Sequence, residues 1–274
     1  MILQMAATPR PQGKEVPMDE LAPERVLTYD RLQVLVFRDG AALAARAAHD
    51  VATFLAQRIR ERGEAAVMVA TGNSQLAFMA ALTRRQEVDW SRVTVFHLDE
   101  YLGMSEDHPA SFRRYIRERL VDIVRPQAFY GIRGDALDAE AEIARYTQLL
   151  REHRPDACVM GIGENGHLAF NDPPADFDTQ DTMRVVTLDE ACRRQQLGEG
   201  WFRTLDEVPR QALTLTVPAL LAPERLFVVV PERRKAPAVK RALEGPVTPE
   251  CPASMLQRQP HAVLYLDAES ASLL

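Results

Sequence analysis

Short hydrophobic runs recur along most of the chain, with longer amphipathic segments between them. The runs are continuously apolar rather than alternating, which is typical of strands buried on both faces of a sheet. We expect strands at Val34–Phe37, Val67–Thr71, Val93–Leu98, Ala157–Ile162, Leu226–Val230 and Ala262–Leu266. This pattern predicts a parallel sheet that is covered by helices.

The segments between these runs carry hydrophobic residues at helical spacing. In Ala41–Arg62, the side chains of Leu43, Ala47, Val51 and Leu55 fall on one helix face. Shorter segments of the same kind are Leu76–Leu82, Ile143–Leu150 and Lys235–Leu243. The alternation predicts an α/β fold, a single Rossmann-like doubly wound domain with a mostly parallel sheet flanked by helices.

One domain accounts for most of the chain. Its length of 274 residues suits one large α/β domain, and no Gly/Ser linker, internal repeat or low-complexity tract divides it. Residues 1–30 contain several prolines and charged residues. We therefore expect an N-terminal arm over residues 1–30 and the α/β domain over residues 31–274.

Composition and charge exclude several classes of partner. The hydrophobic content is 46%, and the formal net charge of −6 argues against general nucleic-acid binding. No apolar run approaches the roughly 18 residues of a membrane span, and the N-terminus lacks the order of charge and apolar core that a secretory signal needs. Three cysteines without CxxC spacing suit free thiols. We expect a cytoplasmic protein that binds neither membrane nor nucleic acid.

Polar residues follow the predicted strands at the carboxyl ends, where α/β sheets bind ligands. The run that ends at Thr71 continues into Gly72, Asn73 and Ser74 before a helix. Backbone N–H groups, hydroxyls and the helix dipole together form an anion site. The alternative is an ordinary strand-to-helix turn with a capping serine. The segment also lacks the lysine of a P-loop.

Two adjacent carboxylates, Asp99 and Glu100, close another predicted strand. Side chains alternate along a strand, so we expect only one of the two to face the crevice. A carboxylate there would suit proton abstraction from carbon if it is kept dry. Solvated carboxylates at a loop entrance are the alternative. His97 and His108 suggest a metal site with Asp99, but no metal-binding spacing supports it.

The loop Gly161–Pro174 carries the densest chemistry. It contains a literal GxGxxG after a strand, but a dinucleotide site also needs a helix at the third glycine. The prolines at 173 and 174 stop a helix there. What remains is His167 between Asn165 and Asp172, and imidazole transfers protons readily near neutral pH.

A cluster of cations, Arg233, Arg234 and Lys235, follows the predicted strand Leu226–Val230. Three cations at a strand end often form a solvated face. In this architecture they also fall where an anionic substrate would lie, and Lys or Arg side chains can clamp a phosphate.

The order of these motifs carries a family resemblance. The matching segments are Ala70–Ser74, His97–Gly103 with His108, Pro109 and Ser111, Gly161–Pro173, and Lys235 with Ala236. They resemble the glucosamine-6-phosphate deaminase (isomerase) family, from about Val34 to Asp267. The resemblance implies a cytosolic Rossmann-like enzyme, often a homohexamer, that acts on a phosphorylated amino sugar. It would open the ring of glucosamine 6-phosphate, isomerise it and release ammonia without a metal or redox cofactor.

Roles for individual residues follow from the same resemblance. Asp99 looks like the base that moves a proton between C2 and C1, and His167 looks like the acid/base that opens the ring. Asn165 and Asp172 are expected to belong to the catalytic group with His167. We call Thr71, Gly72, Asn73, Ser74 and Lys235 the phosphate cradle. Glu100 and Gly163 are further expected substrate contacts.

The sequence also departs from the family pattern. Asn165 stands where the family usually has Asp, and Asp172 stands where it has Glu. Either Glu164 or Asp172 would have to supply the carboxylate beside His167, while Asn165 would orient its ring. A phosphate-binding arginine has no clean match, and Arg193, Arg194 or Arg203 is expected to substitute. The short segment after Asp267 argues against the allosteric control of some members.

Two rival functions remain open. A 6-phosphogluconolactonase shares the fold and a Gly-rich His loop, but its loop usually continues into a Ser/Leu-Phe-Pro pattern and its carboxylate segment contains Asp-Glu-Arg. This chain has Ala169–Pro173 and Asp99–Tyr101 at these places instead. The second rival is a catalytically weak protein that senses sugar phosphates on the same scaffold.

Overall fold

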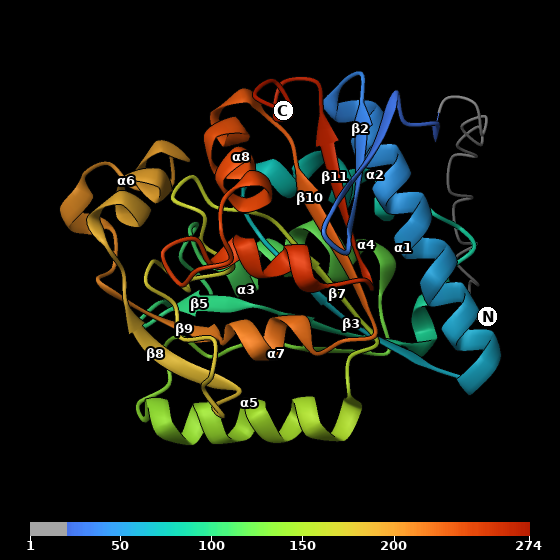
Figure 1. Ribbon diagram of the computed structural model, residues 1–274. Coiled ribbons are helices and arrows are strands. Elements are labelled where there is room, and N and C mark those ends of the chain that lie inside the picture. Colours follow the sequence, from blue (N-terminus) through green and yellow to red (C-terminus); the bar gives the residue numbers. More distant parts are fainter. Residues whose placement is uncertain (1–20) are drawn as a thin grey trace, which may run out of the picture.

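A computed structural model describes residues 21–274, which form one large sheet, one small sheet and surrounding helices (Figure 1). The large sheet has the strand order β1-β2-β11-β10-β7-β3-β4-β6, and the small sheet has the order β5-β9-β8. The strands are β1 Arg25–Tyr29, β2 Leu32–Phe37, β3 Ala65–Val69, β4 Val93–His97, β5 Asp99–Tyr101, β6 Ala128–Tyr130, β7 Ala157–Met160, β8 Met183–Thr187, β9 Gln211–Leu215, β10 Arg225–Val230 and β11 Ala262–Asp267. Except for the β1–β2 pair, the large sheet is parallel, which confirms the predicted fold class.

Helices pack on both faces of the large sheet. They are α1 Gly40–Arg62, α2 Leu76–Leu82, α3 Phe112–Ile116, α4 Asp122–Val124, α5 Ala139–His153, α6 Glu190–Gly198, α7 Val217–Leu221 and α8 Ala236–Glu244. Short 3₁₀ turns precede α2 and α8 at Asn73–Gln75 and Arg233–Lys235. In Figure 1, α5 and α7 lie on the opposite side of the sheet from α1.

Alternation along the strands divides the core into two hydrophobic layers. In β2, Val34 and Val36 belong to the hydrophobic cluster that also contains residues of α5, α7 and α8, while Leu35 and Phe37 belong to the cluster that contains residues of α1 and α2. Because both faces are buried, the strands read as continuous hydrophobic runs in the sequence. Three expected strands end earlier than predicted, at Val69, His97 and Met160.

The first strand lies inside the range that we expected to be an arm. β1, Arg25–Tyr29, pairs antiparallel with β2 through the turn at Asp30 and Arg31. Its side chains are mostly exposed, so it lacks the hydrophobic pattern of the buried strands. Residues 25–29 therefore belong to the sheet, and the part of the expected arm up to residue 20 lies outside the described residues.

The small antiparallel sheet and α6 were not predicted. β5 pairs with β9, and β9 pairs with β8, so three short segments far apart in sequence lie together. The helix α6 is largely polar, with Cys192 and Gln196 as its buried residues, and Figure 1 shows it at the edge of the molecule. Short strands and a polar helix give weak hydrophobic periodicity, which is why the sequence pattern missed them.

The strand order brings four loops to one edge of the sheet. β10, β7, β3 and β4 are consecutive neighbours and run parallel. The residues after their carboxyl ends include all four motifs that the sequence analysis identified, at residues 71–74, 99–100, 161–174 and 233–235. The fold thus assembles the predicted site.

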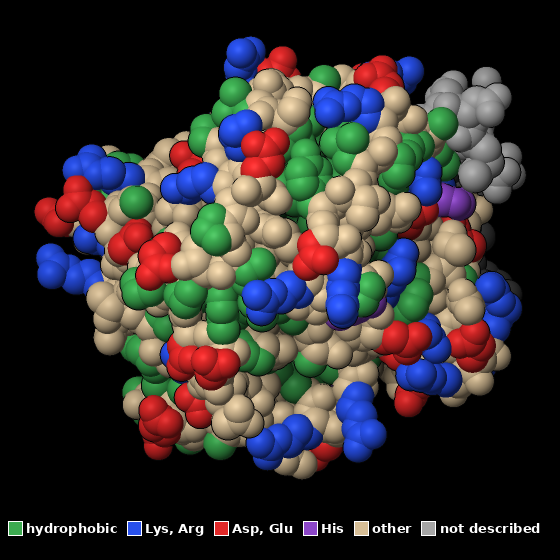
Figure 2. Space-filling view, viewed as in Figure 1, with side chains coloured by type: hydrophobic (Ala, Val, Ile, Leu, Met, Phe, Trp, Pro, Cys, Tyr) green, Lys and Arg blue, Asp and Glu red, His purple; other side chains and the backbone are tan. Residues whose placement is uncertain are grey.

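Two surface features bear on partners. Over residues 21–274, no helix has both the length and the apolar character to cross a membrane. On the face shown in Figure 2, basic and acidic side chains are interspersed rather than gathered into one patch.

Candidate active site

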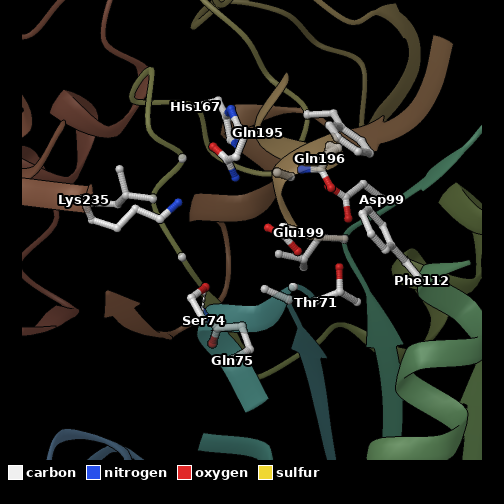
Figure 3. Close-up of a pocket in the computed structure, with 18 residues that line it drawn as sticks. Thr71, Ser74, Gln75, Asp99, Phe112, His167, Gln195, Gln196, Glu199 and Lys235 are labelled. Carbon is white, nitrogen blue, oxygen red and sulfur yellow. Dashed lines mark hydrogen bonds between the residues drawn. The ribbon is translucent and has the colours of Figure 1, made fainter. Parts of the chain in front are cut away.

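A pocket opens at this edge, and the loops after β3, β4, β7 and β10 line it together with α6 (Figure 3). Among the predicted site residues, Thr71, Gly72, Ser74, Asp99, Gly163, His167 and Lys235 line the pocket. The first turn of α3 contributes the ring of Phe112. The structure therefore brings the proposed base, the proposed acid and most of the phosphate cradle into one cavity.

Asp99 is the carboxylate that faces the pocket. It is the first residue of β5, where it pairs with Thr214 of β9, and its side chain is only 6% exposed. Burial raises the pKa of Asp99 well above its usual value, and the neighbouring charge of Glu100 raises it further. A carboxylate with a raised pKa is a stronger base once it is ionised, which suits proton transfer at carbon.

Glu100 points away from the pocket and does not line it, contrary to our expectation of a substrate contact. It is 0% exposed. Its Oε1 accepts hydrogen bonds from the backbone N–H groups of Tyr101 and Phe112, and its Oε2 accepts from the hydroxyl of Ser111 and the N–H of Arg113. Burial raises the pKa of Glu100 to about 7, against the lowering effect of these bonds. Its role is to fix the start of α3 against β5.

His167 has a carboxylate partner, and that partner is Asp172. The imidazole Nδ1 lies 3.2 Å from Asp172 Oδ1. Burial raises the pKa of Asp172, but its interaction with His167 and the hydrogen bond from Asn165 outweigh this, so the pKa is lowered overall. Asp172 thus stays ionised beside the imidazole. Glu164, the other candidate, forms an ion pair with Arg234 instead.

Asn165 holds the loop and the carboxylate rather than the imidazole ring. Its Oδ1 accepts a hydrogen bond from the backbone N–H of His167 at 3.0 Å. Its Nδ2 donates to Asp172 Oδ1 at 3.0 Å and to Asp189 Oδ2 at 3.4 Å. The expected orientation of the ring by Asn165 is therefore indirect and acts through Asp172. A carboxamide can donate to this carboxylate, whereas an ionised aspartate at 165 would repel it.

Gly163 is required by the position of the imidazole. A Cβ at this residue would lie 2.2 Å from His167 Nε2, far inside contact distance. Only a glycine lets the backbone pass beneath the ring. The loop after β7 therefore needs its glycine to present His167 to the pocket, and no helix begins in this loop, as the prolines predicted.

Cys192 of α6 lies beside this pair. Within residues 21–274, His167, Asp172 and Cys192 are the one group of three potential metal ligands, with ligand atoms within 4.8 Å of one another. Burial raises the pKa of Cys192 well above its usual value, and the charges of Asp172 and Asp189 add to this. The thiol therefore stays protonated, and the thiolate is the form that binds metals.

The other histidines do not form the metal site that we considered with Asp99. His97 is fully buried, and its Nε2 accepts a hydrogen bond from the N–H of Ile132. Burial lowers the pKa of His97 to about 3, so the ring is neutral. The Nδ1 of His108 accepts from the N–H of Ala110. Both rings support the backbone.

The phosphate cradle is assembled with one exception. Gly72 adopts φ 99° and ψ 164°, a conformation that favours glycine and that turns the chain towards the pocket. Thr71 and Ser74 line the cavity, but Asn73 does not. Both polar groups of Asn73 are engaged by Glu199: its N–H donates to the carboxylate and its Nδ2 donates to the backbone oxygen.

Lys235 is the cation of the cluster that enters the pocket. Its side chain is only 3% exposed, and Figure 3 shows its ammonium group directed into the cavity. Burial lowers the pKa of Lys235, and the charge of Arg234 lowers it further. Arg234 is paired with Glu164 and Glu232, and Arg233 is exposed near Glu269.

No arginine of the region around α6 substitutes for the missing phosphate ligand. Arg193 donates to the backbone oxygens of Leu205 and Val208, and Arg194 pairs with Glu190 at the surface. Neither they nor Arg203 line the pocket. The helix instead presents Gln195, Gln196 and Glu199, three pocket residues that sequence reasoning missed. The available sequence signal was their spacing. Glu199 follows Gln195 by four residues and Gln196 by three, so the three side chains fall on one face of a helix.

Comparison with known proteins identifies relatives of this site and fold. A family model described as glucosamine-6-phosphate isomerases/6-phosphogluconolactonase matches residues 38–265. The glucosamine-6-phosphate deaminase of Exiguobacterium sibiricum is 38% identical over 75% of this chain and 80% of its own length. That of Listeria monocytogenes is 36% identical over 75% and 86%.

Solved structures give the same grouping. A monomeric glucosamine-6-phosphate deaminase matches with a TM-score of 0.81 and 32% identity, over 88% of this chain and 99% of that protein. A 6-phosphogluconolactonase from Shewanella baltica matches with a TM-score of 0.71 and 22% identity, over 85% and 96%. The second likeness shows the shared fold alone.

The hydrogen bonds that the Glu100 carboxylate accepts lead to a prediction about stability. In Glu100→Gln, the new Nε2 cannot accept a hydrogen bond, so one buried N–H group loses its partner. We expect the free energy of unfolding in urea to fall by about 1–3 kcal/mol. The control is Glu118→Gln, which removes an exposed carboxylate paired with Arg114 and should change the value by less than about 0.5 kcal/mol. Equal stability of both variants would contradict a structural role for Glu100.

Proposed function

Because the chain belongs to the family of glucosamine-6-phosphate isomerases and 6-phosphogluconolactonases, we propose that it converts glucosamine 6-phosphate and water to fructose 6-phosphate and ammonia. The observation that carries the proposal is the pairing, in one pocket, of a buried carboxylate with a His–Asp pair. Ring opening and isomerisation need two separate proton transfers. This site offers one group for each.

His167 acts first in the proposed mechanism. It transfers a proton between the C1 hydroxyl and the ring oxygen, and this opens the sugar. Asp172 stabilises the imidazolium that forms during the transfer. Asp99 then takes the proton from C2, which gives an enolamine, and returns it to C1. A proton also moves from the amino nitrogen to the C1 oxygen, so that C1 becomes an alcohol and C2 becomes an imine. Water hydrolyses the imine and releases ammonia.

The buried environment of Asp99 favours this reaction over lactone hydrolysis. Hydrolysis of a lactone needs an activated water and no base at carbon. Asp99 has the raised pKa that proton abstraction from carbon requires. The relatives above 30% identity are named deaminases, whereas the lactonase structure from Shewanella baltica is 22% identical.

Several expectations stay predictions. These are the roles of individual site residues, action without a metal or redox cofactor, and a cytoplasmic location. We also predicted a homo-oligomer, although the solved relative with a TM-score of 0.81 is described as monomeric. Light scattering on the purified protein measures the assembly directly.

The test of function is a paired product assay. Purified protein is incubated with glucosamine 6-phosphate, and ammonia and fructose 6-phosphate are measured in the same samples. We expect the two products in equal amounts. Hydrolysis of 6-phosphogluconolactone without ammonia release would identify a lactonase, and binding without any turnover would identify a sensor; either result overturns the proposal.

The substitution Asp99→Asn should remove turnover while the protein stays folded. The carboxamide has the same shape but cannot accept the C2 proton. Positioned acid–base groups contribute about 10²–10⁴-fold, so we expect kcat to fall by about that factor. Sugar-phosphate binding, measured by calorimetry, should remain. A folded variant that keeps its turnover would show that Asp99 is not the base.

The pH dependence of kcat tests Asp99 independently. A base must be ionised, and the pKa of Asp99 is raised well above 3.8. As the pH falls through the raised pKa, kcat falls, so the acid limb lies at higher pH than an ordinary aspartate would give. The pKa of Glu100 is also raised, to about 7. The limb should therefore persist in Glu100→Gln, and a limb near pH 4 in the wild type would contradict the assignment.

A further inference from the structure

Glu199 occupies the phosphate cradle. This residue follows the last turn of α6, and its Oε2 accepts a hydrogen bond from the backbone N–H of Asn73 at 3.2 Å. A Cβ added at Gly72 would lie 3.5 Å from the same oxygen. Figure 3 shows the carboxylate inside the ring of lining residues, near Thr71. A carboxylate therefore takes a backbone donor that the cradle would offer to a phosphate.

The charges of the cradle fit this arrangement. Among the ion pairs of residues 21–274, none includes Glu199 or Lys235, although both line the same pocket. Burial and the charge of Arg234 lower the pKa of Lys235, and the charges of Glu164 and Glu199 oppose that lowering. Lys235 is thus a buried ammonium that faces an internal anion across the cavity.

The free space in the pocket is small. The cavity holds about 70 Å³, whereas pockets for small-molecule ligands span about 300–1,000 Å³. We therefore expect lining side chains to move when a hexose phosphate enters. Glu199 is the candidate to move, because it lies at the exposed end of a short polar helix and not in the core.

We propose that Glu199 is a built-in competitor for the phosphate of the substrate. The inference rests on the proposed function, in which that phosphate enters the cradle. In the free protein the carboxylate occupies the cradle and holds the end of α6 over the pocket. Binding of the phosphate displaces it and releases Asn73, whose side chain also donates to the Glu199 backbone oxygen.

The physical basis is competition between like charges for one set of donors. A carboxylate and a phosphate cannot share the N–H of Asn73, and their repulsion is strong in a partly buried site. Phosphate affinity is then reduced by the fraction of molecules in which the cradle is free. A cradle that is self-occupied in about nine molecules of ten lowers the affinity about tenfold.

Inorganic phosphate is the probe that tests this without turnover. Its affinity is measured by isothermal titration calorimetry for the wild type, Glu199→Gln and Glu199→Ala. The first variant removes the charge and keeps the shape, and the second removes the occupant. We expect both to bind phosphate about tenfold more tightly. Unchanged or weaker binding in both would overturn the proposal and would indicate that Glu199 contacts the substrate directly.

The matched control is Glu190→Gln. It makes the same change in net charge on the same helix, but Glu190 is exposed and pairs with Arg194. Its phosphate affinity should equal that of the wild type. If Glu190→Gln gained as much phosphate affinity as the Glu199 variants, the change in net charge alone would explain the effect, and the proposal would be overturned.

Failure of the two proposals is distinguishable. If glucosamine 6-phosphate yields no ammonia, the proposed function fails, while the phosphate titration still decides the role of Glu199. If ammonia is released but the Glu199 variants do not tighten phosphate binding, this inference fails alone.

Discussion

Between His97 and Asp99 the chain leaves the large parallel sheet and enters the small antiparallel one, and hydrogen bonds on both sides fix that step. The hydroxyl of Tyr146 donates to the backbone oxygen of His97 and accepts from its N–H. Glu100 binds the start of α3 on the other side. The pocket depends on this crossing, because it aims Asp99 into the cavity and buries it there.

A second arrangement gives the carboxylates of Asp99 and Asp172 opposite environments. Burial and the like charge of Glu100 raise the pKa of Asp99, whereas hydrogen-bond donors and an imidazole beside Asp172 lower its pKa. The same functional group therefore has a raised pKa in one place and a lowered pKa in the other, as the proposed roles of base and fixed charge require. Asn165 belongs to the second environment, where its carboxamide donates to Asp172.

The strands and helices of the large sheet were predictable because burial on two faces gives long hydrophobic signals. The small sheet and α6 were not, because β5 has only three residues and α6 is polar, so neither gives a long hydrophobic signal. The strand-end rule located Asp99, His167 and Lys235. It could not separate Asp99 from Glu100 or reveal Glu199, because both depend on which distant backbone groups lie nearby. Local sequence does not encode those neighbours.

The contact between Gly163 and His167 has a consequence for how this loop can vary. The imidazole fills the volume that any side chain at 163 would need. The two positions are therefore energetically coupled, and the effects of changing them cannot add. A lineage that lost the histidine would be free to enlarge residue 163, and after that step the histidine could not return unless the glycine returned first. The loss of this proposed acid–base group would thus be hard to reverse by single substitutions.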